Sequence, residues 1–353
     1  MAEKIARRYG ISESVDARSA EDTTSSENNT TASLAGRDLQ PNRGVALNRD
    51  WIEEIRVNTS AVERRAQTLV TRRTVKKDWQ VAWLLRAISC MDLTTLSGDD
   101  SDERVRRLCA KARYPIRHNL VKQMDIEKLQ IKVAAVCVYH AFVETALRAL
   151  EGSGIKVAAV STGFPAGLSP LDERVAEISR SIRAGAQEID VVITRAHVFG
   201  ARWAELFDEI ATFKAACGSA HMKVILGTGD LLTLRNVARA SMVAMMAGAD
   251  FIKTSTGKET VNATLPVGVV MTRAIREYAH NTGMAVGFKP AGGIRTAKQS
   301  LEWLALMKEE LSDSWLSADL FRLGASGTLA DIERQLEFHA TGHYSAEHRH
   351  PIA

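Results

Sequence analysis

The stretch "MKVILGTGDLLTLRNVARASMVAMMAGADFIKTSTG" (residues 222–257) contains one complete strand–helix–strand pattern. Two short apolar runs, 222–229 and 250–257, flank a helical pattern at 234–249. The helical pattern ends in Ala-Gly-Ala, where Gly248 suits a helix C-terminus. Continuous apolar strands that alternate with helices are typical of a parallel sheet buried on both faces.

Six further runs of this kind bring the total to eight. They lie at 87–96, 132–140, 155–163, 188–195, 285–293 and 320–327. Eight strand–helix repeats over roughly 250 residues predict an α/β fold of the (β/α)8 TIM-barrel type. A doubly wound open sheet is the competing interpretation, and the number of repeats favours the barrel. The absence of a repeat of fixed length argues against a solenoid.

The chain outside these runs divides by composition. Residues 1–45 are rich in Ser, Thr, Asn, Asp and Glu, which predicts a disordered tail. Residues 46–80 predict a helical N-terminal extension with Trp51 and Ile55 among its packing contacts. We assign 81–345 to the barrel domain and 346–353 to a C-terminal tail.

The overall composition is that of an ordinary globular protein. Of the 353 residues 45% are hydrophobic and 25% charged, with a formal net charge of +4. No basic stripe with interleaved aromatics points to nucleic acid, and no apolar run is long enough to span a bilayer. The N-terminus lacks the apolar core of a signal peptide. We therefore expect a cytoplasmic protein that binds neither nucleic acid nor membrane, and a homodimer is compatible with the sequence.

The four cysteines and nine histidines do not form a recognisable metal motif. The cysteines lack CxxC spacing, which predicts reduced thiols. The histidines are scattered, and four of them fall in the polar C-terminal segment. We therefore predict no metal site.

Charged and polar residues near the ends of the apolar runs are the strongest functional signal. The C-terminal ends of parallel strands meet at one face, where α/β proteins bind ligands. One charge there is most simply a salt-bridged or snorkelling residue. Two lysines and two aspartates on four different strands make that interpretation strained, because buried charge is costly unless paired. The candidates are Asp92, Thr94, Cys137, Asp190, Lys253 and Lys289.

Two converging lysines point to imine chemistry. An unprotonated amine condenses with a carbonyl, whereas a lysine with an ordinary pKa near ~10.4 is almost entirely protonated at neutral pH. A second ammonium ~5 Å away, at an effective dielectric of ~20, repels by ~3.3 kcal/mol, equivalent to a pKa decrease of ~2.4. Lys253 and Lys289 are one strand–helix–strand step apart, so their strands are expected to be neighbours. Asp190 is the natural proton carrier.

Two glycine-rich segments suggest an anion site. "PAGGIR" (290–295) and "LGASG" (323–327) follow the seventh and eighth runs. Loops at these positions of a barrel often bind phosphate through backbone N–H groups. Tight strand-to-helix turns would also require these glycines, and both roles are compatible. The predicted anion-binding residues are Gly292, Gly293, Arg295, Gly324, Ser326 and Lys258.

Five segments resemble the deoxyribose-phosphate aldolase family. They are "MDLTTL" (91–96), "EIDVV" (188–192), "GADFIKTSTG" (248–257), "VNAT" (261–264) and "GFKPAGGIR" (287–295). The resemblance covers roughly residues 80–345, and the lead-in and C-terminal segment are more similar to the eukaryotic-type branch. It implies a class I aldolase on a TIM barrel that needs neither metal nor organic cofactor. The implied reaction is reversible cleavage of 2-deoxy-D-ribose 5-phosphate to acetaldehyde and D-glyceraldehyde 3-phosphate in deoxyribonucleoside catabolism.

The resemblance also implies roles for individual residues. Lys253 would form the Schiff base, Lys289 would tune it and Asp190 would relay protons. Asp92, Thr94 and Cys137 would contact the substrate. Thr256 and Gly257 would join the anion-binding residues, and Tyr344 is the candidate for a C-terminal tyrosine that assists proton transfer in some relatives.

The match departs from the family pattern after the eighth run. Gly327 stands where relatives often have a second hydroxyl, which removes one expected phosphate contact. Two other functions compete with this aldolase. One is a transaldolase-like Schiff-base enzyme acting on another sugar phosphate, and the other is a non-catalytic scaffold whose N-terminal tail recruits partners.

Overall fold

The computed structural model describes residue 34 and residues 38–72, 75–346 and 349–350. Most of the tail predicted at 1–45 lies outside these residues. Where residues 38–45 are described, the structure differs from the predicted disorder. Strand β1 (Gln40–Pro41) pairs with β8 (Met284–Ala285). The amide of buried Asn42 donates to the carbonyls of Met245 and Ala249, because this turn packs against the barrel's helices.

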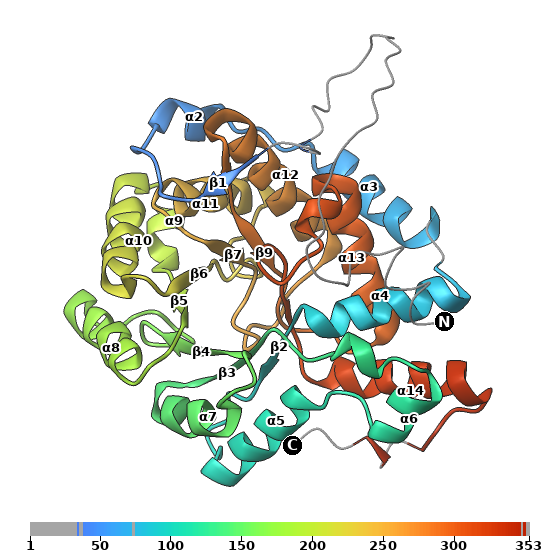
Figure 1. The fold of residues 1–353 in the computed structure, drawn as a ribbon. Helices are drawn as coiled ribbons and strands as arrows, with labels where there is room; N and C mark the ends of the chain where they lie inside the picture. Colours follow the sequence, from blue (N-terminus) through green and yellow to red (C-terminus); the bar gives the residue numbers. More distant parts are fainter. Residues whose placement is uncertain (1–33, 35–37, 73–74, 347–348, 351–353) are drawn as a thin grey trace.

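Eight parallel strands form the central sheet, and the predicted barrel is confirmed. The strand order is β10-β2-β3-β4-β5-β6-β7-β9. Isolated parallel bridges, Phe288 with Phe321 and Ala291 with Gly324, link β9 back to β10. The ring of strands and its surrounding helices are visible in Figure 1. The strands are β2 (Met91–Thr94), β3 (Ala135–Tyr139), β4 (Lys156–Ser161), β5 (Glu188–Val192), β6 (His221–Ile225), β7 (Phe251–Lys253), β9 (Gly287–Lys289) and β10 (Leu323–Gly324).

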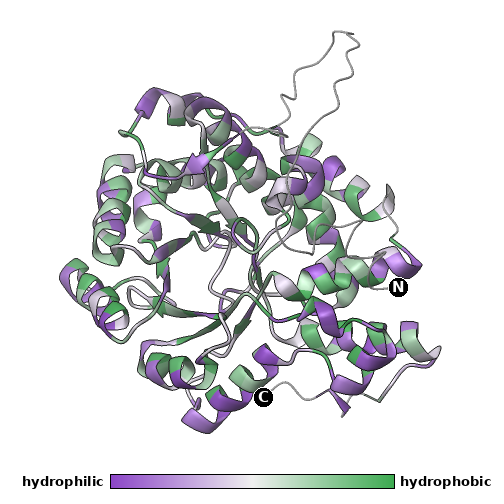
Figure 2. Ribbon diagram, viewed as in Figure 1, coloured by the Kyte–Doolittle hydropathy of each residue, from purple (hydrophilic) through white to green (hydrophobic). Residues whose placement is uncertain are grey.

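Helices follow the strands and cover the outside of the barrel. They are α5 (Asp102–Arg113), α6 (His118–Gln123), α7 (Val143–Leu150), α8 (Leu171–Arg183), α9 (Arg195–Phe199), α10 (Trp203–Cys217), α11 (Leu234–Met246), α12 (Leu265–Thr282), α13 (Ala297–Leu311) and α14 (Gly327–Thr341), with short 3-10 turns η1 (Glu127–Leu129), η2 (His140–Phe142) and η3 (Asp313–Trp315). The strands are mostly hydrophobic, whereas the helices carry both kinds of residue (Figure 2). None of the described helices has the length and hydropathy needed to span a membrane.

Three helices precede the barrel strands: α2 (Arg49–Glu54), α3 (Thr59–Arg72) and α4 (Lys77–Ser89). Helix α4 contacts α13 and α14 and buries Leu84, Leu85 and Ile88. The boundary that we placed at residues 80 and 81 therefore falls inside one helix. The first apolar run, predicted at 87–96, also includes the last turn of α4, and only Met91–Thr94 forms the strand.

Local sequence explains how the helices begin at the mouth of the barrel, which is the end where the strands finish. Side chains of Thr233, Thr264 and Thr296 accept hydrogen bonds from the first turns of α11, α12 and α13. Gly248 follows α11 with a φ of 95°, as its Ala-Gly-Ala ending predicted, and Gly185 follows α8 in the same way with a φ of 98°.

Candidate active site

Strand register decides which side chains face the inside of the barrel. Asp190 pairs with Lys223 on β6, and Lys253 pairs with Lys289 across β7 and β9. Neighbouring strand residues such as Val191 and Ile252 belong instead to the hydrophobic core. Because successive side chains on a strand point to opposite faces, the charged residues project inward.

Seven charged side chains meet inside the barrel, and we call them the ion cluster. None is more than 4% exposed. The four that the sequence predicted, Asp92, Asp190, Lys253 and Lys289, are all brought together. The sequence interpretation missed the other three, Glu188, Lys223 and Arg322. A usable signal existed, because Glu188 and Asp190 alternate on β5 and therefore share a face.

Asp190 is the centre of the ion cluster. Its Oδ2 lies 2.8 Å from the Nζ of Lys253 and 2.8 Å from the Nζ of Lys289. The two ammonium nitrogens are thus no farther apart than twice this distance, as the strand spacing led us to expect. The other oxygen, Oδ1, accepts from Lys223 at 3.0 Å. One carboxylate therefore contacts three lysines from three consecutive strands of the barrel.

Arg322 joins the remaining carboxylates. Its Nη1 lies 2.7 Å from Asp92 Oδ1, and its Nη2 lies 2.7 Å from Glu188 Oε1. Asp92 Oδ2 also pairs with Lys289 at 2.5 Å, and Glu188 pairs with Lys223. The ion cluster is therefore continuous from β10 and β2 across the barrel to β5 and β6.

Charge balance and contact number single out Lys253. Four cationic groups face three carboxylates, so the cluster is electrically balanced when one cation loses its proton. Lys253 contacts one carboxylate, whereas Lys289 contacts two and Lys223 lies closely against two. The amine with the fewest anionic partners is the easiest to deprotonate.

The pKa directions agree with this ranking. Burial lowers the pKa of Lys253, Asp190 opposes this effect, and Lys289 lowers the pKa further. Burial would also lower the pKa of Lys289, but Asp190 and Asp92 outweigh it and raise the pKa. For Lys223, burial is likewise outweighed by Asp190 and Glu188, and its pKa is raised. Repulsion by Lys289 therefore acts in the predicted direction, but burial is the larger cause.

The carboxylates remain ionised despite complete burial. Burial alone would raise the pKa of Asp190, but Lys223, Lys253 and Lys289 together hold it well below its usual range. Asp92 behaves in the same way, since Lys289 and Arg322 outweigh burial and lower its pKa. Both carboxylates can accept hydrogen bonds at neutral pH without taking up a proton.

Cys137 faces the interior beside the ion cluster. It packs with Leu96, Ala158 and Val160, and Tyr139 and Phe164 lie against this small apolar group. Burial raises the pKa of the Cys137 thiol to about 11, so it stays protonated. All four cysteines are free and buried. The described part of the chain contains no group of three or more His, Cys, Asp or Glu side chains placed to hold a metal ion.

The loop after β7 is occupied by one of its own side chains. The carboxylate of Glu259 accepts from the backbone N–H groups of Thr256 and Gly257 at 3.0 and 3.1 Å and from the Thr256 hydroxyl at 2.7 Å. The sequence had placed Gly257 and Lys258 at an anion. In the structure the Gly257 N–H already has an internal anionic partner, and Lys258 is exposed.

The loops after β9 and β10 lie side by side. The N–H of Gly292 donates to the Gly324 carbonyl at 3.4 Å, and exposed Gly293 adopts a φ of 80°. Ser326 precedes α14, and its hydroxyl exchanges two hydrogen bonds with the backbone of Thr94. These contacts join Gly292 to Gly324 and Ser326 to Thr94, all four of which the sequence predicted as site residues. Arg295 is exposed at the edge of this group.

Tyr344 follows α14 on the outside of the barrel. Its ring stacks on Phe338 with centroids 4.3 Å apart, and the residue is 57% exposed. In this arrangement Tyr344 is not part of the ion cluster.

The chain was compared with protein families, with curated proteins and with solved structures. Residues 86–314 match the family model described as DeoC/LacD family aldolase. The chain is 58% identical to deoxyribose-phosphate aldolase from Mus musculus over 88% of this chain and 98% of that protein, and 57% identical to the Homo sapiens enzyme over 88% and 99%. A deoxyribose phosphate aldolase structure from Aeropyrum pernix, described as tetrameric, superimposes with a TM-score of 0.54 at 23% identity, covering 79% of this chain and 99% of that one.

Proposed function

The chain belongs to the DeoC/LacD family of aldolases, and from this premise we propose that it reversibly cleaves 2-deoxy-D-ribose 5-phosphate through an imine on Lys253. The products would be acetaldehyde and D-glyceraldehyde 3-phosphate. The observation that carries the mechanism is the single carboxylate contact of Lys253 within a cluster of four cations and three carboxylates. The names of the mouse and human relatives support the substrate.

The amine of Lys253 would attack the C1 aldehyde and expel water to form the imine. A base then takes the proton of the C3 hydroxyl while the C2–C3 bond breaks. The electron pair of that bond moves toward the protonated imine nitrogen and leaves a neutral enamine, and glyceraldehyde 3-phosphate departs. Protonation at C2 and hydrolysis release acetaldehyde and restore the amine.

Asp190 and Lys289 supply the proton path in this proposal. Asp190 contacts both lysines through one oxygen, so a proton leaving Lys253 meets an ionised carboxylate already bonded to the second ammonium. Water would complete the path to the substrate. Positioned acid–base groups of this kind contribute ~10²–10⁴-fold to a rate.

The phosphate would bind at the loops after β9 and β10. Three features favour this side: Gly293 is exposed at positive φ, Ser326 lies at the start of the 15-residue helix α14, and helix N-termini attract anions. Glu259 disfavours the neighbouring loop after β7, because its carboxylate would repel a phosphate and already holds the loop's N–H groups.

Borohydride reduction in the presence of acetaldehyde tests the imine directly. We expect an ethyl adduct on Lys253 by peptide mass mapping, and none on the exposed Lys258 five residues later. An adduct at another lysine, or no adduct from an active preparation, would contradict the assignment.

A donor comparison tests the substrate. Cleavage of 2-deoxyribose 5-phosphate that releases acetaldehyde supports the proposal. Activity with dihydroxyacetone-type donors and none with acetaldehyde would favour the transaldolase-like alternative.

A further inference from the structure

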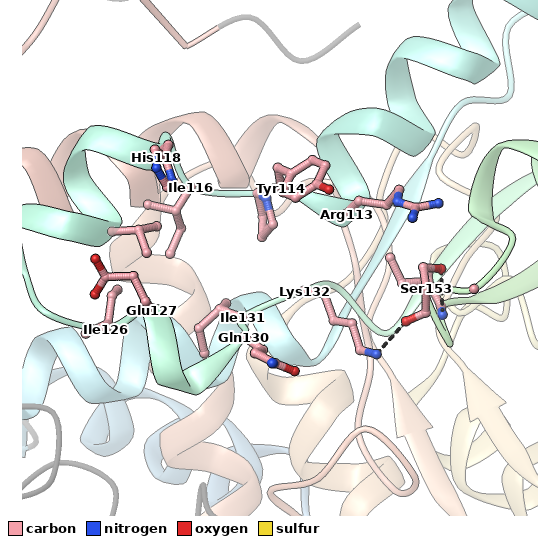
Figure 3. Close-up of a pocket in the computed structure, with 14 residues that line it drawn as sticks. Arg113, Tyr114, Ile116, His118, Ile126, Glu127, Gln130, Ile131, Lys132 and Ser153 are labelled. Carbon is pink, nitrogen blue, oxygen red and sulfur yellow. Dashed lines mark hydrogen bonds between the residues drawn. The ribbon is translucent and has the colours of Figure 1, made fainter.

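A cavity lies at the opposite end of the barrel from the loops that follow the strands. Its volume is about 680 Å³, and it is bounded by α5, α6, η1 and the segments that enter β3 and β4 (Figure 3). Ile131 and Lys132 precede β3, and Ser153 and Ile155 precede β4. The cavity therefore opens at the amino ends of the strands and shares no lining residue with the ion cluster.

The cavity has an apolar wall that continues the hydrophobic core. Ile116, Ile126 and Ile155 line it with 2–5% of their surface exposed, and Ile131 packs partly buried beside them. Tyr114 also lines the cavity but is 72% exposed, the most exposed tyrosine among the described residues. An aromatic ring standing at the edge of an apolar wall can cover a bound apolar group.

One end of the cavity is cationic. Arg113 donates through Nη1 to the carbonyls of Ala149 and Glu151 at 3.1 and 3.0 Å, and Lys132 donates to the Ser153 carbonyl at 2.5 Å. Over the ranges that the structure describes, neither side chain pairs with a carboxylate. The Nε and Nη2 donors of Arg113 are left for another partner, since a guanidinium carries five N–H groups.

Capping of α7 explains part of this arrangement. Arg113 contacts the carbonyl of Ala149, in the last turn of α7, and the carbonyl of Glu151, the residue after the helix. Cations are favoured at this end of a helix. Capping uses one nitrogen of Arg113, and the Ser153 carbonyl holds Lys132 separately, but neither contact requires the adjoining cavity. Charges held in advance cost little further ordering when a ligand binds.

The opposite end of the cavity differs in charge. Figure 3 shows His118 and Glu127 there, on the side of the cavity away from Arg113 and Lys132. A negatively charged group would thus be attracted to only one end, near Arg113 and Lys132. The cavity therefore fits an elongated molecule with an anionic head and an apolar body better than a neutral hydrocarbon or a compact ion.

We propose that this cavity binds a small amphipathic organic anion. Its carboxylate or phosphate head contacts Arg113 and Lys132, its apolar body lies along Ile131 and Ile155, and Tyr114 covers it. The volume falls within the ~300–1,000 Å³ typical of small-molecule sites. This proposal does not depend on the reaction at Lys253.

Calorimetry with three probes tests the proposal on the full chain. We expect saturable binding of octanoate, and much weaker binding of octan-1-ol, which lacks the charge, and of acetate, which lacks the apolar body. Lys132→Gln should weaken octanoate binding by about fivefold, the effect of one partly exposed ion pair. Lys122→Gln, an exposed lysine of α6 outside the cavity, is the matched control and should change nothing.

A second variant and a competition experiment locate the binding. Tyr114→Ala, at an exposed position, should also weaken octanoate binding while leaving the aldolase rate unchanged. Equal binding of octan-1-ol and octanoate, or undiminished octanoate affinity in both variants, would overturn the proposal. So would the absence of saturable octanoate binding, or its competition by a sugar phosphate, which would place the probe at the mouth of the barrel.

Discussion

Lys253 differs from the other buried lysines in how few carboxylates surround it. All three lysines are buried inside the barrel, so burial opposes the charge of each one. The number of anionic contacts then decides which amine loses its proton most readily, and of the three only Lys253 has a lowered pKa. The lowered pKa of Lys253 is thus a property of its neighbours' pairing rather than of its own position alone.

Replacing Lys289 with leucine should raise the pKa of Lys253. The variant removes a repelling ammonium and frees Asp190 to pair with Lys253, so less free amine is present at neutral pH. We expect the rate at pH ~7 to fall by ~10²–10⁴-fold and the residual activity to keep rising to higher pH than in the parent enzyme. The measurement is the pH dependence of kcat/KM.

The control for this prediction is Lys298→Leu. That lysine lies on α13 with a side chain 76% exposed and should keep the parent profile. A Lys289→Leu profile that superimposes on the parent would mean that Lys289 does not tune Lys253.

Asp190→Asn should separate imine formation from proton relay. The amide keeps the shape of the side chain but cannot carry the proton, so kcat should fall by ~10²–10⁴-fold. Loss of the carboxylate also lowers the pKa of Lys253, so trapping of acetaldehyde on Lys253 by borohydride should persist. If the folded variant lost trapping along with turnover, the relay role would be refuted. Asp208→Asn, on the exposed side of α10, is the control variant and should keep both trapping and turnover.

At the scale of strands and loops, the sequence predicted positions better than boundaries. Eight short apolar runs located all eight barrel strands, because buried parallel strands are continuously apolar. The first run nevertheless included the end of α4, since Ala87 and Ile88 are as buried in a helix as they would be in a strand. Apolar composition alone does not separate the two.

The three ion-cluster residues that the sequence analysis missed show a second limit of prediction from sequence. Arg322 and Glu188 are 134 positions apart, and only closure of the ring brings them within hydrogen-bonding distance. Lys223 lies in an apolar strand like Lys253, but it precedes the strand's end by two residues. Asp190, which is in register with Lys223, also lies two residues before the end of its strand, so distance from the strand end does not separate the lysine that was missed from the aspartate that was found.

The contact between β9 and β10 leaves no room for a side chain at Gly324. A Cβ there would lie 2.7 Å from the Cβ of Ala291 and 3.3 Å from Lys289 Cε. Gly324→Ala should therefore cost ~1–3 kcal/mol of unfolding free energy and reduce turnover by displacing Lys289. Urea unfolding and kcat would be measured together.

Gly293→Ala provides the comparison for that change. Gly293 has a φ of 80° but open space around its Cβ position, so only backbone strain of ~1 kcal/mol is expected. Equal stability of the two variants would show that crowding at Gly324 is not the cause.

At the scale of the whole molecule, the ion cluster ties the two ends of the sheet to its middle. Arg322 beside β10 reaches Asp92 on β2 and Glu188 on β5. The barrel is thus held by backbone pairing around its circumference and by ion pairs across its diameter. Breaking a buried pair by removing one partner is costly because the other charge remains.

Arg322→Met should lower the unfolding free energy by about 3–5 kcal/mol, because Asp92 and Glu188 lose their shared partner. Adding Glu188→Gln should recover part of the loss by neutralising one stranded carboxylate. Urea unfolding of the single and double variants measures both effects. A double variant less stable than the sum of the single changes would contradict this explanation.

Stability should also fall steeply in acid. The pKa values of Asp92, Glu188 and Asp190 are lowered in the folded chain. Their stabilising contribution is therefore present above the unfolded values near ~4 and is lost as pH falls through the lowered folded values. We expect the urea midpoint to decrease below pH ~5, and less so in Glu188→Gln; a midpoint independent of pH down to ~3 would contradict this.

The shared ion cluster has an evolutionary consequence. A substitution at any of its seven positions would be exposed to selection twice, once through turnover and once through the amount of folded protein in the cell. A lineage could exchange one member without harm only if a compensating change were already present at its partner. We expect these positions to drift in pairs, with neutral intermediates rare, while the exposed faces of the surrounding helices diverge freely.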